Sequence, residues 1–184
     1  MELEDSRQFF HMVVGFAAIA VLLIWGRGVL LAAVFFTIII GTVLMNLRLL
    51  GRSIPLIEWF EERFERKGVP LPGWGSACFA TGALVAAAFL KDPSQIAAVL
   101  LALGIGDGIS NIIGRRGGTR LPYNRKKTVE GMAAMFASSL LAWVFIGPLA
   151  LPLALIAAVA ESVPRLDDNL TVPVACTLFL LVVG

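Results

Sequence analysis

The sequence predicts an all-α membrane protein, a polytopic helical bundle of about seven transmembrane helices with one additional interfacial amphipathic helix. Of its 184 residues, 58% are hydrophobic and only 15% are charged, whereas a soluble domain has nearer half apolar and a quarter charged residues. The hydrophobic residues gather in separate runs that are long enough to cross about 30 Å of hydrocarbon. No linker divides the chain, so residues 1–184 are expected to form a single integral membrane domain.

Seven apolar segments are predicted to span the membrane, with boundaries uncertain by a few residues. They cover residues 9–25, 29–47, 73–90, 94–113, 129–146, 148–163 and 171 to the end. Gly147-Pro148 leaves only a tight turn between the fifth and sixth segments. These two helices are therefore expected to pack antiparallel.

The stretch IPLIEWFEERFERKG at 54–68 has one apolar and one acidic side. Ile57, Phe60 and Phe64 recur at helical spacing, while the glutamates point elsewhere. This pattern predicts an amphipathic helix lying in the headgroup plane. Such a helix is either a plain connector or lines the entry for a lipid substrate.

The distribution of positive charge predicts the orientation in the membrane. Thirteen of the fifteen Lys and Arg residues fall on the side of the N-terminus, and the opposite turns hold only Arg27 and Lys91. The positive-inside rule then places the N-terminus and any active site in the cytoplasm of a multi-pass cell-membrane protein. The acidic N-terminus, MELEDSRQ, lacks the positive region of a cleavable signal peptide, so the first segment is expected to remain.

One acidic residue, Asp107, lies within an apolar segment among three alternating glycines. A carboxylate there costs roughly 2.5–3.5 kcal/mol on insertion scales, so it usually faces a polar cavity and has a function. Six cations follow it: Arg115, Arg116, Arg120, Arg125, Lys126 and Lys127. Together they favour a nucleotide and its metal ion at the membrane surface. Taken separately, the basic loop is also what a topology signal would look like, and Asp107 could be a structural acceptor.

A second acidic group, ESVPRLDDN at 161–169, follows the sixth segment and holds Glu161, Asp167, Asp168 and Asn169. Oxygen ligands of this kind suit Mg²⁺, which commonly takes one or two carboxylates together with substrate phosphates. The fourth and sixth segments run in the same direction, so this group and Asp107 are expected to share one Mg²⁺–nucleotide site. The absence of Cys/His clusters argues against zinc.

The single histidine, His11, lies just inside the first segment and shares a helix face with Arg7, one turn earlier. A lone histidine is often a structural residue. Here it opens toward the side that carries the other polar groups, which favours a functional role.

These motifs together resemble the CTP-dependent lipid kinases, a family that includes dolichol kinase, phytol kinase and the CTP-using diacylglycerol kinase and is related to the CDP-diacylglycerol synthases. The similarity runs from Arg7 to Pro173. It is carried by Arg7 and His11; by Gly106, Asp107, Ser110, Gly114, Arg115 and Arg116; by Lys127, Thr128, Glu130 and Gly131; and by Glu161, Ser162, Asp168, Asn169 and Pro173. The third motif is shared with the synthases, whereas the fourth differs from theirs. The chain departs from the usual kinase pattern at Gln8, Gly108 and Asn111.

The resemblance implies a phosphotransferase that moves the γ-phosphate of CTP, or of another nucleoside triphosphate, to a lipid alcohol such as dolichol, phytol, geranylgeraniol or diacylglycerol. The expected catalytic residues are Asp107, Lys127, Glu161, Asp168 and His11, and the expected Mg²⁺ ligands are Asp107, Asp167, Asp168 and Glu161. Nucleotide contacts are expected from Gly106, Ser110, Gly114, Arg115, Arg116, Lys126, Thr128, Glu130, Asn169 and Arg7.

Two alternatives use the same residues. A cytidylyltransferase that makes a CDP-lipid would need the same cations and metal with a phosphate nucleophile, and a transporter could use Asp107 as its coupling site. The expected partners are the nucleotide, the lipid alcohol and membrane lipids, with no nucleic acid. Self-association into a homo-oligomer stays open.

Overall fold

The computed structural model describes residues 3–64, 71, 73–164 and 167–183, and within these ranges every extended regular element is a helix. The helices are α1 (Leu3–Leu49), α2 (Pro55–Phe64), α3 (Trp74–Phe89), α4 (Pro93–Leu101), α5 (Asp107–Arg116), α6 (Val129–Ser139), α7 (Trp143–Ile146), α8 (Ala150–Ser162) and α9 (Asp168–Val183). A π-helical turn, Ala102–Gly106, joins α4 to α5, and short 3₁₀ turns flank α7. The predicted all-α class is confirmed for these residues.

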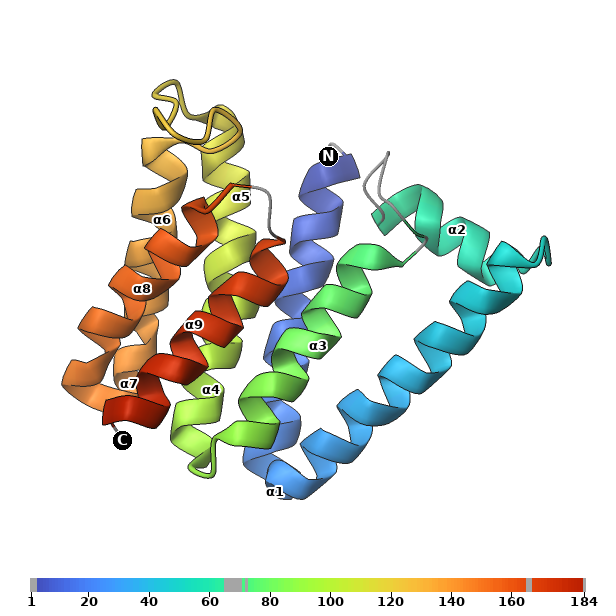
Figure 1. Cartoon of the computed structure of the whole chain (residues 1–184), viewed down its shortest axis with the longest axis horizontal. Helices are drawn as coiled ribbons and strands as arrows, with labels where there is room; N and C mark the ends of the chain where they lie inside the picture. The colour runs from blue at the N-terminus through green and yellow to red at the C-terminus, as the bar shows by residue number, and fades with distance from the viewer. Residues whose placement is uncertain (1–2, 65–70, 72, 165–166, 184) are drawn as a thin grey trace.

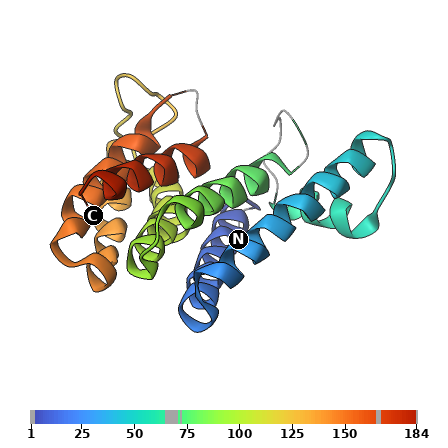
Figure 2. The same ribbon diagram turned by 60° about the horizontal axis from the view of Figure 1, so that its bottom comes forward.

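Helix α1 consists of two arms that meet at a sharp turn. Gly26 has φ 83° and ψ 173°, a conformation that only glycine adopts readily because it lacks a Cβ. The first arm descends from the N-terminus, and the second rises away from the bundle to α2 (Figures 1 and 2). The arms correspond to the two predicted segments at 9–25 and 29–47.

Arg27 fastens this turn to the end of α3. Its Nε donates to the carbonyl oxygen of Ala87 at 2.7 Å and its Nη2 to that of Ala88 at 2.9 Å. The last carbonyls of a helix have no partner within the helix, and a cation placed there also favours the helix dipole. The residue therefore holds the base of α1 against α3.

The helix that runs from Pro93 to Arg116 is the centre of the bundle. In its most apolar stretch of 18 residues, 78% of the residues are buried. The corresponding stretches of Asp5–Leu49 and Val129–Ser162 are only 11% and 28% buried. Helix α4 is apolar all round, with Ile96, Leu100 and Val99 fully buried, as expected of a helix enclosed by others. Helices α1, α3, α7 and α9 pack against it.

Three helical stretches of the described chain are long and apolar enough to cross a membrane: Asp5–Leu49, Pro93–Arg116 and Val129–Ser162. Helices α3 and α9 are apolar but shorter, with 16 residues each. The chain turns within the last stretch at Gly147, whose φ is +55°, and α6 packs on α8. The protein is thus a helical membrane protein, and the count of seven spans stays a prediction.

Glycines bring distant polar segments together at two helix crossings. A Cβ on Gly15 of α1 would lie 2.8 Å from the Cα of Gly104 in the central helix. The two helices can therefore approach this closely because both positions are glycine. A Cβ on Gly82 of α3 would likewise collide with the backbone of Asn169 in α9. The first crossing sets the start of α1 beside the start of α5, and the second sets α3 against the start of α9.

One end of the bundle collects the polar segments. The N-terminus, the end of α5, the loop at 117–128, the end of α8 and the start of α9 all lie there, and the C-terminus lies at the opposite end (Figure 1). Helix α2 begins on the same side, after the second arm of α1. The fold thus gathers charged groups from three regions that are far apart in the sequence: the N-terminus, α5 with the loop that follows it, and the end of α8 with the start of α9.

Candidate active site

Three carboxylates from three helices converge at this end of the bundle. Asp107 begins α5, Glu161 lies in the last turn of α8, and Asp168 begins α9. One oxygen from each lies within 4.8 Å of those of the other two. Asp107 and Glu161 are each only 2% exposed, and buried like charges at this spacing repel one another strongly unless a cation neutralises them.

Lys127 supplies such a cation. Its Nζ donates to Asp168 Oδ2 at 2.7 Å and also to Glu161 Oε1. Burial lowers the pKa of Lys127, but Asp168, Asp107 and Glu161 together raise it further, so the net pKa lies above the ordinary value. The ammonium is therefore charged throughout the physiological pH range.

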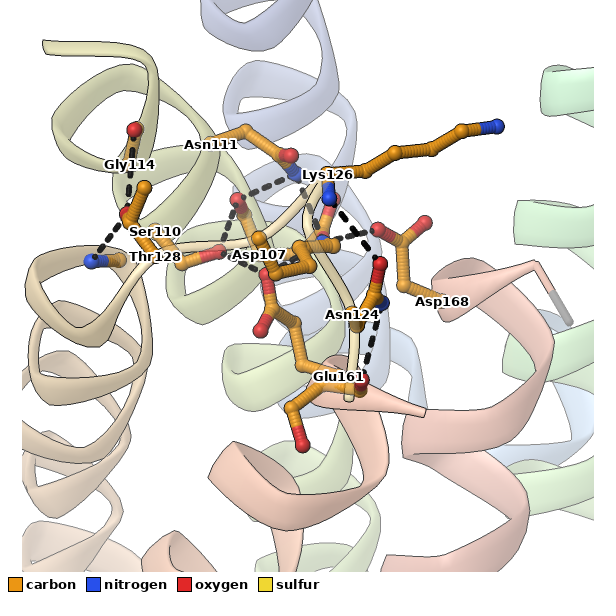
Figure 3. A network of polar contacts seen from close by, with 12 residues as sticks. Asp107, Ser110, Asn111, Gly114, Asn124, Lys126, Thr128, Glu161 and Asp168 are labelled. Carbon is orange, nitrogen blue, oxygen red and sulfur yellow. Dashed lines mark hydrogen bonds and ion pairs between the residues drawn. The ribbon is translucent and has the colours of Figure 1, made fainter. Parts of the chain in front are cut away.

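Neighbouring polar side chains fix the carboxylates in place (Figure 3). Asn111 Nδ2 donates to Asp107 Oδ1 at 2.9 Å, and Ser110 Oγ donates to Glu161 Oε1 at 3.1 Å. The second oxygen of Glu161, Oε2, is buried and has no hydrogen-bond partner among the described residues. A buried carboxylate oxygen without a partner is costly, and it leaves a ligand position open.

The loop at 117–128 carries Lys127 and is tied to the surrounding helices. Thr128 caps α6: its Oγ1 accepts from the Gly131 N–H at 3.1 Å and donates to the carbonyl of Gly114. Glu130 accepts from the backbone N–H groups of residues 118 and 119. Asn124 donates to the backbone of Ser162 at 3.0 Å. These bonds hold Lys127 over the end of α8.

The other cations of this region point elsewhere. Arg115 and Arg116 both form ion pairs with Asp5 of α1. The side chain of Lys126 extends away from the carboxylates (Figure 3). Arg120 and Arg125 are exposed on the same loop. Among the cations of α5 and the loop at 117–128, Lys127 is the one whose ion pairs reach Glu161 and Asp168.

His11 joins the first and last helices beside the carboxylates. Its Nε2 lies 2.6 Å from Asn169 Oδ1, and its ring packs edge-on against Phe79 with 4.3 Å between the ring centroids. Because an amide oxygen only accepts, Nε2 is the protonated nitrogen in this arrangement and Nδ1 is the basic one.

A cavity of about 450 Å³ begins at these groups and continues between the two arms of α1 and helix α3. The rest of its wall is mostly apolar, and its polar end is lined by Arg7, Gln8, His11, Asp107, Asn111, Asp167, Asp168 and Asn169. Phe60 and Phe64 of α2 close part of its side and pack on Phe10 of α1. These two contacts agree with the predicted apolar face of α2; the side chain of Ile57 lies outside the described residues.

The structure separates the predicted site residues into two groups. Asp107, Lys127, Glu161, Asp168, His11, Asn169 and Arg7 lie at or beside the polar end of the cavity. Several others have structural contacts: Gly106 packs on Met135 and Ser139, Gly114 on Gly131, and Ser110, Thr128 and Glu130 make the hydrogen bonds described above. Asp167 lines the cavity but accepts from Trp74 Nε1 and from the backbone of Asn169, outside the group of three carboxylates.

Sequence reasoning did not assign a role to three residues of this region. Asn111 orients Asp107 from one helical turn further along, at the i+4 spacing that places two side chains on one face. Asn124 and Tyr123 bind the backbone and the hydroxyl of Ser162. The spacing could have indicated Asn111, but nothing in the sequence indicates the loop contacts.

Several known proteins are similar to this chain, and two of them are plant proteins named as probable phytol kinases. The chain is 34% identical over 160 residues to a probable chloroplastic phytol kinase of rice (Oryza sativa subsp. japonica), covering 75% of the chain and 53% of the relative. It is 37% identical over 123 residues to a probable phytol kinase of wheat (Triticum aestivum), covering 53% and 40%. The chain thus spans about half or less of the length of these kinases.

A relative of matching length is an uncharacterised protein of the archaeon Methanocaldococcus jannaschii. It is 32% identical over 174 residues, which cover 92% of this chain and 88% of the archaeal one. The chain belongs to the same family as this archaeal protein. No family model matches the chain, and no solved structure matches it significantly.

Proposed function

We propose that the protein is a membrane-embedded kinase that transfers the γ-phosphate of a nucleoside triphosphate, CTP according to the family resemblance, to the hydroxyl group of a lipid alcohol. One observation carries the proposal. The convergence of Asp107, Glu161 and Asp168 on Lys127 lies at the polar end of a cavity whose remaining wall is mostly apolar. A phosphate-handling site and a hydrocarbon-binding site are thus continuous.

The carboxylates have the chemistry of a Mg²⁺ site. All their ligand atoms are oxygens, and the buried Oε2 of Glu161 lacks another partner in the described chain. Two oxygens on one Mg²⁺ lie at most about 4.2 Å apart, because each bond is about 2.1 Å long. The observed limit of 4.8 Å therefore requires only a small approach. When bound, Mg²⁺ would neutralise charge on the transferring phosphate.

The protein's own groups would position the two substrates. Phosphoryl transfer needs mainly orientation and charge neutralisation. Lys127 and the exposed cations of its loop would hold the phosphates, and Asn111 keeps Asp107 oriented. A lipid hydroxyl at the polar end of the cavity would lie near both His11 and Asp107, either of which could accept its proton.

Incubation of the purified protein with a lipid alcohol and CTP labelled at either the γ- or the α-phosphate tests the proposal. A kinase is expected to place label in the lipid from the γ position only. Label arriving from the α position would instead identify a cytidylyltransferase. ATP labelled at the γ-phosphate in a parallel reaction separates CTP from ATP as the donor.

We also propose that the site faces the cytoplasm in a multi-pass arrangement, because the exposed cations of the loop at 117–128 follow the positive-inside rule. In a background with Cys78 and Cys176 replaced by alanine, a cysteine introduced as Arg120→Cys is expected to react with an impermeant thiol reagent only in opened cells. Lys91→Cys, exposed at the opposite end of the bundle, is the control and is expected to react in intact cells. The reverse pattern would overturn this orientation.

A further inference from the structure

The apolar part of the cavity has a definite depth. Its lining on the first arm of α1 runs from Arg7 to Val21, a distance of roughly 21 Å at 1.5 Å per residue. This is about two thirds of the hydrocarbon thickness of a bilayer. Val21 and Leu30, on either side of the turn at Gly26, lie at the far end. The cavity therefore ends near the base of α1.

Small side chains create the room along this depth. Ala17 and Ala33, on facing arms of α1, and Ala80 and Ala83 of α3 line the middle of the cavity. Ala17 and Ala33 are exposed, so larger side chains there would enter the cavity without disturbing the packed core. Ala17 lies roughly 9 Å further along the helix axis than His11.

We propose that this part of the cavity holds a single hydrocarbon chain of the lipid alcohol and that Ala17 and Ala33 set the length of chain that is accepted. The inference rests on the proposed function, which places the hydroxyl at the polar end near His11. A volume of about 450 Å³ is in the lower half of the roughly 300–1,000 Å³ of typical ligand pockets. Spread over this depth, the space suits one chain beside a small head group rather than the two chains of a glycerolipid.

The chain would bind by burying apolar surface in a site of matching length. Each CH₂ group buried contributes about 0.8 kcal/mol, so a chain that fills the cavity is preferred over a shorter one. A phenyl ring at position 17 would occupy the path roughly 9 Å beyond His11 along the helix axis. The variant should then bind short alcohols as before and lose the advantage of long ones.

The experiment compares Ala17→Phe with Ala20→Phe, a matched control on the same helix at an exposed position outside the cavity lining. Equilibrium binding of tritiated geraniol, geranylgeraniol and diacylglycerol is measured without nucleotide, and the melting temperature of each variant checks folding. For Ala17→Phe, affinity for geranylgeraniol is expected to fall at least about tenfold while affinity for geraniol is unchanged. Ala20→Phe is expected to match the unmodified protein. Ala33→Phe provides an independent variant on the second arm with the same expected pattern.

The outcomes distinguish this proposal from the function it rests on. Unchanged affinity for geranylgeraniol in both Ala17→Phe and Ala33→Phe would overturn the length determinant, even if the protein is an active kinase. Tighter binding of diacylglycerol than of geranylgeraniol by the unmodified protein would overturn the single-chain site. Length-dependent binding without phosphorylation of any alcohol would leave this inference standing and remove the kinase assignment.

Discussion

Asp107→Asn is expected to leave a folded protein whose phosphoryl transfer falls by at least about 10²–10³-fold, the range typical of losing one group that stabilises transition-state charge. Asparagine keeps the shape of the side chain and can still accept from Asn111. It lacks the negative charge that a Mg²⁺ ligand needs in a site enclosed by Glu161 and Asp168. The initial rate with saturating nucleotide and alcohol measures the effect.

The same variant is expected to lose stabilisation by Mg²⁺ and nucleotide. A ligand that binds only the folded state raises the melting temperature, and this rise should be present in the unmodified protein and absent in Asp107→Asn and Asp168→Asn. Asp92→Asn is the matched control, because Asp92 caps α4 at the other end of the bundle and asparagine caps helices equally well. An undiminished rate in Asp107→Asn would remove the metal-ligand assignment.

Lys127→Met is expected to lower the rate of phosphoryl transfer about as much as Asp107→Asn does. Unlike Asp107→Asn, it is expected to increase the stabilisation that Mg²⁺ provides. The ammonium of Lys127 bonds to Glu161 and Asp168, two of the three candidate ligands, so metal entry must displace it from the carboxylates. Removing it leaves the buried carboxylate of Glu161 without its lysine partner, which costs about 3–5 kcal/mol in comparable buried pairs. The metal-free variant should melt at a lower temperature, and Mg²⁺ alone should restore more stability than it adds to the unmodified protein.

Thermal denaturation over a range of Mg²⁺ concentrations measures this response, with Lys126→Met as control, because that neighbouring side chain points away from the carboxylates (Figure 3). Because the pKa of Lys127 is raised in the folded state, its stabilising contribution is complete below the ordinary lysine pKa and is lost only as the pH rises through the higher folded value. The charge of Lys127 therefore does not change near neutral pH. Equal Mg²⁺ responses in Lys127→Met and the unmodified protein would contradict competition between lysine and metal.

The sequence predicted the helical class and the convergence of the acidic groups, because both depend on coarse physical patterns. Apolar runs of sufficient length must be helical in a membrane. The direction of successive spans placed Asp107 and Glu161 at the same end, where the structure has them. That the converging carboxylates bind a metal ion stays a prediction.

The roles of Ser110, Thr128 and Glu130 could not be predicted in the same way. A motif identifies the residue type but not the direction of the side chain, and these three make hydrogen bonds within the chain rather than facing the cavity. The cavity itself was also beyond sequence reasoning. Its wall depends on ordinary alanines, such as Ala17, whose spacing does not differ from that of residues facing lipid.

The π-helical turn before Asp107 determines which way that side chain faces. The N–H of Asp107 donates to the carbonyl of Ala102, five residues earlier rather than four. The turn thus holds one residue more than an α-helical turn, which rotates everything after it by roughly 100° relative to a regular helix. Helix α4 can therefore present apolar residues on every side, while α5 shows Asp107 and Asn111 to the cavity. One inserted residue thus rotates the second half of this continuous helix relative to the first. The first half packs in the core, and the second half carries the polar side chains of the site.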